Sequence, residues 1–265
     1  MMTQQTLTQL RSLKLSGMAD ALQAQMAQPS MSALSFEERL GLLVQQETAS
    51  RDDRRRTRLL SLAHLKYPQA AIEDIDTRAG RGIERSQITS LVLGDWIKTG
   101  HTVIITGATG TGKTWLACAL GQYACRRGHS VTYLRTPRLA EELRVLHGAG
   151  SFGKWLLQLA KTDVLILDDW ALATLDGSTR ADLLEVIDDR AAHRGTIITS
   201  QLPVEHWHGW IGDVTIADAM LDRLLERTHR ITLKGEKSLR SALPESARKP
   251  GAVANAAATA DGEVV

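Results

Sequence analysis

The stretch Gly107-Ala-Thr-Gly-Thr-Gly-Lys-Thr114 decides how this chain folds. It follows an apolar run, TVIIT at 102–106, and opens a stretch of helical character at 113–127. It fits the pattern G-x-x-x-x-G-K-[ST] in the strand–loop–helix context that this pattern requires. Glycines let a backbone wrap a phosphate with its N–H groups pointing inward, and a helix N-terminus adds partial positive charge. The stretch therefore predicts a phosphate-binding loop.

The loop predicts a site for ATP and Mg²⁺. Lys113 is expected to contact the β- and γ-phosphates, and the Thr114 hydroxyl is expected to ligate Mg²⁺. The residues expected to touch the nucleotide run from the first glycine to the tryptophan after the loop: Gly107, Ala108, Thr109, Gly110, Thr111, Gly112, Lys113, Thr114 and Trp115.

Two acids, Asp168 and Asp169, follow the apolar run Val164-Leu-Ile-Leu. The carboxyl ends of parallel strands form the edge of a sheet where ligands bind. We expect Asp168 to hold Mg²⁺, directly or through water, and Asp169 to orient and activate the attacking water. The alternative is that both acids cap the next turn.

Strand-like and helix-like stretches alternate through the second half of the chain. Apolar runs at 102–106, 131–134, 163–168, 196–200 and 229–233 are separated by helical stretches at about 113–127, 137–147, 152–161, 178–193 and 215–228. This alternation predicts an α/β fold with a five-stranded parallel sheet that is covered on both faces.

The chain before the loop is predicted to be helical. Apolar residues from Leu7 to Met26 recur at helical spacing and favour one helix that ends before Pro29, and Ser35-Phe-Glu-Glu38 matches a capping box that starts a second helix. We expect a small helical domain at 1–66, a linker with a short helix at 67–100, the core at 101–243, and a disordered Ala/Gly-rich tail at 244–265.

Composition limits the class of protein. Apolar residues make up 43% of the 265 and charged residues 23%, with a formal net charge of +2. No apolar run approaches the roughly 20 residues that span a bilayer, and the N-terminus lacks the pattern of a secretory signal, so we expect a cytoplasmic protein with no membrane partner. Cys118 and Cys125 are expected to be small buried hydrophobic residues.

A wider set of motifs carries a family resemblance: LRSLKLSGMADAL, YPQAAIEDID, GATGTGKTWLACALG, VLILDDW, IITSQLPVEHWHGWIGD and TIADAMLDRLLERTHRITLKGEKSLR. The chain resembles the IstB-type transposition helper ATPases, in the DnaC-like branch of the AAA+ superfamily. The resemblance implies an AAA+ core that hydrolyses ATP, binds double-stranded DNA, assembles into homo-oligomers with nucleotide at subunit interfaces, and recruits or activates a transposase.

The resemblance also implies roles for single residues. Either Ser200 or Gln201 would sense the γ-phosphate at the end of its strand. Arg223 matches an arginine finger, with Arg227 as the fallback, and its alternative is a surface pairing with Asp222 or Glu226. Arg240 would act as a second sensor that contacts nucleotide.

DNA contacts are expected to be non-specific contacts with phosphates. The candidates are arginines on the second helix and after the second strand: Arg51, Arg54, Arg55, Arg56, Arg58, Arg135 and Arg138. A solvated or protein-contacting helix face is the alternative for the first five.

Two other functions share the phosphate loop. A replicative helicase loader of the DnaC kind would share the whole core and differ in its N-terminal module. A small-molecule kinase would need an acceptor pocket and a closing lid, and DNA should not stimulate it.

Overall fold

A computed structural model describes residues 2–77 and 80–235. The expected C-terminal tail and Arg240 lie outside the described residues. Five strands form one parallel sheet in the spatial order β2-β3-β4-β1-β5. The strands are β1 Thr102–Gly107, β2 Val131–Arg135, β3 Val164–Trp170, β4 Gly195–Ser200 and β5 Thr228–Leu233. The predicted α/β class and the five-stranded parallel sheet are confirmed.

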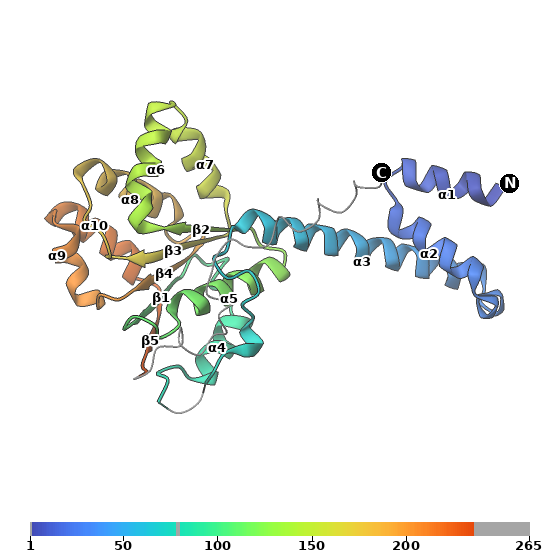
Figure 1. The fold of residues 1–265 in the computed structure, drawn as a ribbon, viewed down its shortest axis with the longest axis horizontal. Helices are drawn as coiled ribbons and strands as arrows, with labels where there is room; N and C mark the ends of the chain where they lie inside the picture. The colour runs from blue at the N-terminus through green and yellow to red at the C-terminus, as the bar shows by residue number, and fades with distance from the viewer. Residues whose placement is uncertain (1, 78–79, 236–265) are drawn as a thin grey trace, which may run out of the picture.

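Helices cover both faces of the sheet, because alternate strand residues point to opposite sides. Val103 and Ile105 pack with α5 (Lys113–Arg126) and α4 (Arg85–Leu93) in one apolar core. Ile104 packs into a second core, on the other face. That face is covered by α6 (Thr136–Gly148), α7 (Phe152–Lys161), α8 (Gly177–Arg190), α9 (Trp207–Ile211) and α10 (Val214–Leu225). Figure 1 shows the two helical layers on either side of the strands.

The N-terminal segment folds as two helices where one was expected: α1 Met2–Ser12 and α2 Ser16–Ala27. Lys14 has a left-handed φ of 60°, and its N–H donates to Arg11 O while Leu15 N–H donates to Leu10 O. These two bonds form a Schellman motif, which ends a helix by satisfying its last carbonyls. The helical spacing of apolar residues therefore continues past Lys14, although backbone hydrogen bonds end the first helix there.

The chain then folds back, and α2 packs against α3 (Phe36–Ala63). A Cβ at Gly17 would lie 2.8 Å from Glu47 Cα, so only glycine permits this approach. The Glu47 carboxylate is buried and accepts hydrogen bonds from Met18 N at 3.1 Å and Arg51 Nε at 2.7 Å. Glu47 thus satisfies an N–H at the start of α2 and fixes the helical hairpin.

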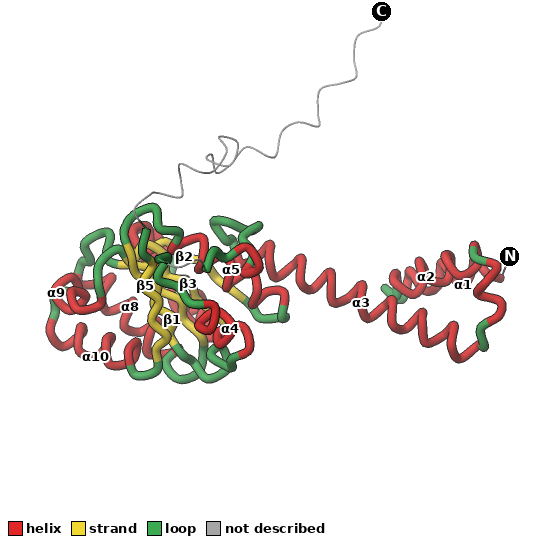
Figure 2. Tube along the Cα trace, turned by 90° about the horizontal axis from the view of Figure 1, so that it is seen from below, coloured by secondary structure: helices red, strands yellow, loops and turns green. Residues whose placement is uncertain are grey.

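The helix α3 links the hairpin to the core. It begins at the predicted capping box, in which Ser35 Oγ accepts from Glu38 N and the Glu38 carboxylate accepts from Ser35 N. It projects away from the sheet, with α1 and α2 along its far half (Figures 1 and 2). Its end is fixed to the core by Ala63, and Leu65 follows in the same apolar cluster as α5. Within the described ranges, no helix has both the length and the apolar character needed to cross a bilayer.

Short 3₁₀ turns complete the chain: η1 Pro29–Ala33, η2 Ile72–Asp74 and η3 Val204–His206. The first joins α2 to α3, the second lies between α3 and α4, and the third leads from β4 to α9. The short helix expected to end near residue 100 is α4, which ends at Leu93. It is followed by a hydrogen-bonded turn in which Lys98 N–H and Thr99 N–H donate to Asp95 O.

Candidate nucleotide-binding site

The phosphate loop runs from the end of β1 to the start of α5. Gly107 has φ +147°, and a Cβ there would lie 2.5 Å from Leu233 O of the neighbouring strand. Gly112, the N-cap of α5, has φ +96°, in the left-handed region. Side chains are disfavoured at both positions, so the glycines of the motif are required by the path of the loop as well as by its proximity to phosphate.

The Lys113 ammonium lies inside this loop. Its Nζ donates to Gly107 O at 2.8 Å and to Ala108 O at 2.9 Å, and the residue is only 7% exposed. The hydroxyl of Thr111 donates to Ala108 O at 2.9 Å and closes the turn. The positive charge is therefore held at the centre of the loop, where a phosphate group would meet it.

Asp168 is fully buried beside the start of α5 and receives three hydroxyl donors. Its Oδ1 accepts from Thr114 Oγ1 at 2.8 Å and from Thr199 Oγ1 at 2.5 Å, and its Oδ2 accepts from Tyr133 OH at 2.5 Å. Burial and the neighbouring Asp168 charge raise the pKa of Tyr133, so the phenol stays protonated and remains a donor. Together, the hydroxyls hold Asp168 in one orientation next to Thr114.

The donor set of Thr114 and Asp168 fits Mg²⁺. A hydroxyl and a carboxylate are hard oxygen ligands, and Mg²⁺ is commonly held by one or two such protein groups while it keeps several waters. Asp168 already accepts on both oxygens, which favours an indirect role through water.

Asp169 lies at an irregular point of β3, where the pairing with β4 shifts register between Leu167 and Trp170. Its φ is +59°, an unusual conformation for a residue with a side chain, and its N–H donates to Thr199 Oγ1 at 3.1 Å. The bulge turns consecutive acids to different surroundings: Asp168 is buried, and Asp169 lines the pocket.

Arg135 lies beside Asp169, which the sequence did not indicate. Its Nη2 donates to Asp169 Oδ2 at 2.7 Å and its Nε donates to the same oxygen at 3.2 Å. The sequence predicts that Arg135 contacts DNA, and in the structure its guanidinium pairs with an acid that lines the pocket. It ends β2 in register with Asp168, so the sheet itself brings it to the acids.

Gln201 and Ser200 have different surroundings. Gln201 lines the pocket, and its Oε1 accepts from Thr109 Oγ1 of the phosphate loop at 2.7 Å. Ser200 is fully buried; its hydroxyl donates to Trp170 O at 2.9 Å and accepts from Leu202 N at 3.0 Å. Of the two sensor candidates, only Gln201 reaches the site.

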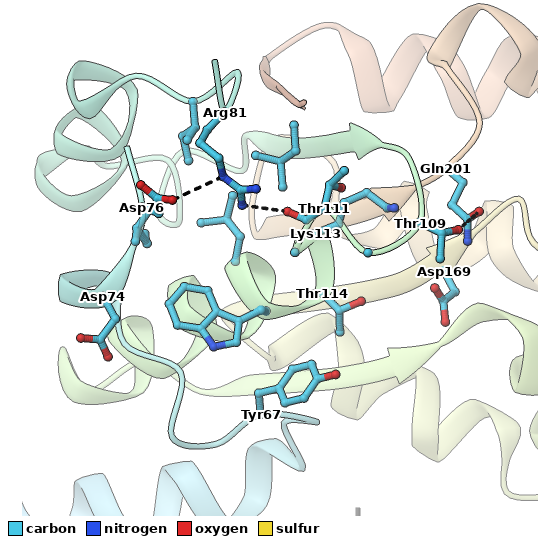
Figure 3. Close-up of a pocket in the computed structure, with 17 residues that line it drawn as sticks. Tyr67, Asp74, Asp76, Arg81, Thr109, Thr111, Lys113, Thr114, Asp169 and Gln201 are labelled. Carbon is cyan, nitrogen blue, oxygen red and sulfur yellow. Dashed lines mark hydrogen bonds and ion pairs between the residues drawn. The ribbon is translucent and has the colours of Figure 1, made fainter. Parts of the chain in front are cut away.

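The pocket itself is a cavity of about 370 Å³ next to the phosphate loop. Figure 3 shows that it extends from the loop to side chains that precede the core in sequence. These residues, which lie in the segment treated as a linker, are Tyr67, Asp74, Ile75, Asp76, Arg81 and Ile83. Arg81 Nη2 donates to Thr111 O at 3.1 Å and so ties this segment to the loop (Figure 3). Part of this wall falls in the motif YPQAAIEDID at 67–76, to which the sequence assigns no contact with nucleotide, and no motif marks Arg81 and Ile83.

Arg223 lies on α10, outside the residues that line the pocket. Its Nε is hydrogen-bonded to Asp188 Oδ1 of α8, and its Nη1 donates to Ala219 O at 2.9 Å. The sequence suggested Asp222 or Glu226 as its surface partner, whereas the structure pairs it with Asp188. The side chain is 34% exposed, so it remains accessible from outside.

The arginines of α3 are largely engaged within the chain. Arg51 pairs with Glu47, and Arg54 hydrogen-bonds to Ser16 Oγ. Arg56 pairs with Asp53 at 3.4 Å, and Arg55 Nη2 donates to Gly128 O at 3.1 Å. Several of the proposed DNA contacts thus also hold the helical hairpin together or join α3 to the core. Arg58 and, on α6, Arg138 are exposed.

This arrangement defines a class. A parallel sheet in the order β2-β3-β4-β1-β5, with a phosphate loop after β1 and acids at the end of β3, is the core of an AAA+ P-loop ATPase. Within this class, the chain belongs to the family of IstB-like ATP-binding proteins, whose model matches residues 8–245.

Relatives agree with this assignment. A Pseudomonas fluorescens protein, named as an ATP-binding protein of insertion sequence IS1162, is 60% identical over 77% of this chain and 88% of its own length. A Sinorhizobium fredii protein, y4pL, named as an insertion-sequence ATP-binding protein, is 44% identical over 91% of this chain and 98% of its own. The chain is thus an insertion-sequence-associated ATP-binding protein.

Solved structures share the fold. The DnaC helicase loader superposes with a TM-score of 0.53 at 20% identity, over 64% of this chain and 99% of its own. DnaI superposes with a TM-score of 0.55 at 18% identity, over 67% of this chain and 94% of its own. At these identities the likeness concerns the architecture of the core.

Proposed function

We propose that this chain assembles as an ATP-dependent oligomer on double-stranded target DNA and recruits or activates the transposase of its insertion sequence. The observation that carries the proposal is the position of Arg223. It is a partly exposed cation on α10 that does not line the pocket of its own chain. Because Arg223 matches the arginine finger of the family, we infer that it contacts the nucleotide bound by a neighbouring subunit.

Within one subunit, the residues divide the work of hydrolysis. Lys113 and the N–H groups of the loop bind the phosphates, and Gln201 senses the γ-phosphate from beside Thr109. Asp169 orients the attacking water. Thr114 and Asp168 would hold Mg²⁺, which would supply positive charge beside the transferred phosphoryl group.

Between subunits, Arg223 supplies the missing positive charge. A guanidinium aimed at the γ-phosphate stabilises the transition state, typically by a factor of about 10³–10⁵ in turnover. ATP bound between two subunits would then favour the assembled state, because it contacts both of them only there. To act as a finger, Arg223 must break its pairing with Asp188 and contact the γ-phosphate instead.

We assign recognition of the partner protein to the N-terminal helical domain, 1–66. It projects from the core on α3 and leaves the nucleotide site to the segment 67–100 and the core at 101–243. A helicase loader would share that core and differ in this domain. The insertion-sequence names of the relatives favour transposition over helicase loading.

Mass measurement of single particles tests the proposal. Wild type, Arg223→Ala and Arg227→Ala, which removes the fallback candidate for the finger, are compared with ATP or ADP, each with and without random duplex DNA. We expect a large oligomer of wild type and of Arg227→Ala with ATP and DNA, but not with ADP, and no such oligomer of Arg223→Ala. A wild type that stays monomeric in all four conditions would overturn the proposal.

A further inference from the structure

The edge of the sheet opposite the nucleotide site carries cations from separate loops. Because all strands are parallel, β1, β2 and β4 begin at this amino-terminal edge. Lys98 precedes β1, Arg127 precedes β2 and Arg194 precedes β4, and Arg55 of α3 joins them. We call these four residues the amino-edge cluster.

Hydrogen bonds and close packing hold the contributing segments together. Arg55 Nη2 donates to Gly128 O at 3.1 Å, which joins α3 to the loop before β2. Asp163 links that loop to the one before β4, since it accepts from Ser130 N at 2.9 Å and from Arg194 Nη1 at 2.9 Å. The loop before β1 packs on the same region: a Cβ at Gly100 would lie 2.3 Å from Ala192 C. The cluster is therefore one continuous surface.

Three cations of this surface act on the partly buried side chain of His129. Burial lowers the pKa of His129, and the charges of Lys98, Arg127 and Arg55 lower it further, although Asp163 acts in the opposite direction. His129 lies among these cations. Asp163 is already occupied by Arg194 and Ser130. Lys98 and Arg127 are exposed, and neither forms an ion pair with another described residue.

We propose that the amino-edge cluster is the surface that binds the phosphate backbone of double-stranded DNA. This rests on the proposed function and gives it a location. Spaced cations on an open surface match a row of phosphates and carry no means of reading bases. Arg58, exposed one helical turn beyond Arg55 on α3, extends the surface along that helix.

The location is compatible with the rest of the assembly. The phosphate loop lies at the carboxyl-terminal edge of the sheet, and Arg223 lies on the α8–α10 side. DNA on the amino-terminal edge therefore leaves the nucleotide site at the opposite edge free. Arg51, Arg54 and Arg56 are also exposed, but they are engaged with Glu47, Ser16 and Asp53, whereas Lys98 and Arg127 have no such ion-pair partner among the described residues.

The test is the salt dependence of duplex DNA binding with ATP. The double variant Lys98→Gln/Arg127→Gln is compared with wild type and with Arg138→Gln/Lys154→Gln, which removes the same charge from exposed positions on α6 and α7. Losing two phosphate contacts should reduce the slope of log K against log salt by about 1.8, at about 0.9 per contact. The control should keep the wild-type slope. Nucleotide affinity and thermal stability, measured in parallel, should be unchanged in both.

The outcomes separate the inference from the proposed function. If wild type binds DNA and the Lys98/Arg127 variant keeps the wild-type slope, the location is wrong and the function stands. If only the α6–α7 control loses slope, DNA binds that surface and the location is also wrong. If wild type does not bind duplex DNA with ATP, the proposed function fails, and the inference fails with it.

Discussion

Arg135 donates two hydrogen bonds to one carboxylate oxygen of Asp169, from Nη2 at 2.7 Å and from Nε at 3.2 Å. The pair is only partly exposed, with 34% of the arginine side chain and 15% of the aspartate side chain accessible. The two hydrogen bonds occupy this oxygen and hold the carboxylate in one orientation. The pairing therefore restrains the group proposed to activate water.

The first prediction concerns this restraint. Arg135→Gln should raise ATP turnover in the absence of DNA several-fold, because the guanidinium no longer occupies Asp169 Oδ2 and this oxygen is free to contact the attacking water. Arg138→Gln, an exposed arginine one turn along, is the control and should turn over ATP as wild type does. Steady-state phosphate release measures both. A turnover at least ten-fold below wild type in Arg135→Gln would instead mean that the guanidinium serves the phosphates.

The second prediction concerns Tyr133. In Tyr133→Phe the buried Asp168 Oδ2 loses its donor, so the free energy of unfolding should fall by about 1–3 kcal/mol. Tyr123→Phe is the control, since Tyr123 donates to a neutral carbonyl, Val92 O, at 3.1 Å and should cost at most about 1.5 kcal/mol. Urea unfolding measures the two. Equal losses would show that the charge on Asp168 adds nothing to the bond.

The third prediction concerns Gly107. Gly107→Ala should abolish ATP binding and destabilise the fold, because the added methyl group would meet Leu233 O at 2.5 Å. Gly153→Ala in α7 adds the same atom in open space, and it should be neutral or stabilising by roughly 0.5–1 kcal/mol. Fluorescent-nucleotide titration and thermal melting report the two effects. Full ATP affinity in Gly107→Ala would contradict the loop geometry.

The fourth prediction concerns pH. Burial raises the pKa of Cys118 to about 11 and that of Cys125 to about 12, from an ordinary value of 9.0. Since folding favours the protonated thiols, their contribution to stability is complete below pH 9 and is lost as pH rises toward 11–12. Cys118→Ala/Cys125→Ala should lose less stability than wild type between pH 9 and 11. An identical pH dependence in the two proteins would contradict this.

Much of the core could be predicted from the sequence, because its signals are local. The strands from 102–106 onward are apolar runs, and the loop at Gly107–Thr114 has a fixed spacing. The break at Lys14 could not be predicted, because the apolar spacing continues through it and only the bonds of Lys14 and Leu15 end the helix.

The site residues that belong to one continuous motif could be predicted from the sequence. The residues that strand pairing brings to the site could not. Lys113 and Asp168 belong to recognisable motifs. Tyr133 and Arg135 reach the acids because β2 pairs with β3 in a register that places Arg135 opposite Asp168. Tyr133 and Arg135 are two residues apart in β2, so their side chains point to the same face of the sheet. This spacing is a signal that can be read from the sequence.

The proposed roles of Asp169 and Arg223 can be separated by mixing. Asp169→Asn should bind ATP without hydrolysing it, and Arg223→Ala should lack the finger, so each alone should show little DNA-stimulated turnover. If Arg223 acts on the pocket of a neighbour, mixed oligomers contain interfaces with an intact Asp169 facing an intact Arg223.

The measurement that tests the central claim most directly is therefore ATP turnover of Asp169→Asn and Arg223→Ala combined on duplex DNA. The account predicts that the mixture recovers activity that neither variant has alone, and that the recovery grows with total protein concentration. Turnover in the mixture no higher than the average of the two separate variants, although mixed oligomers form, would contradict it.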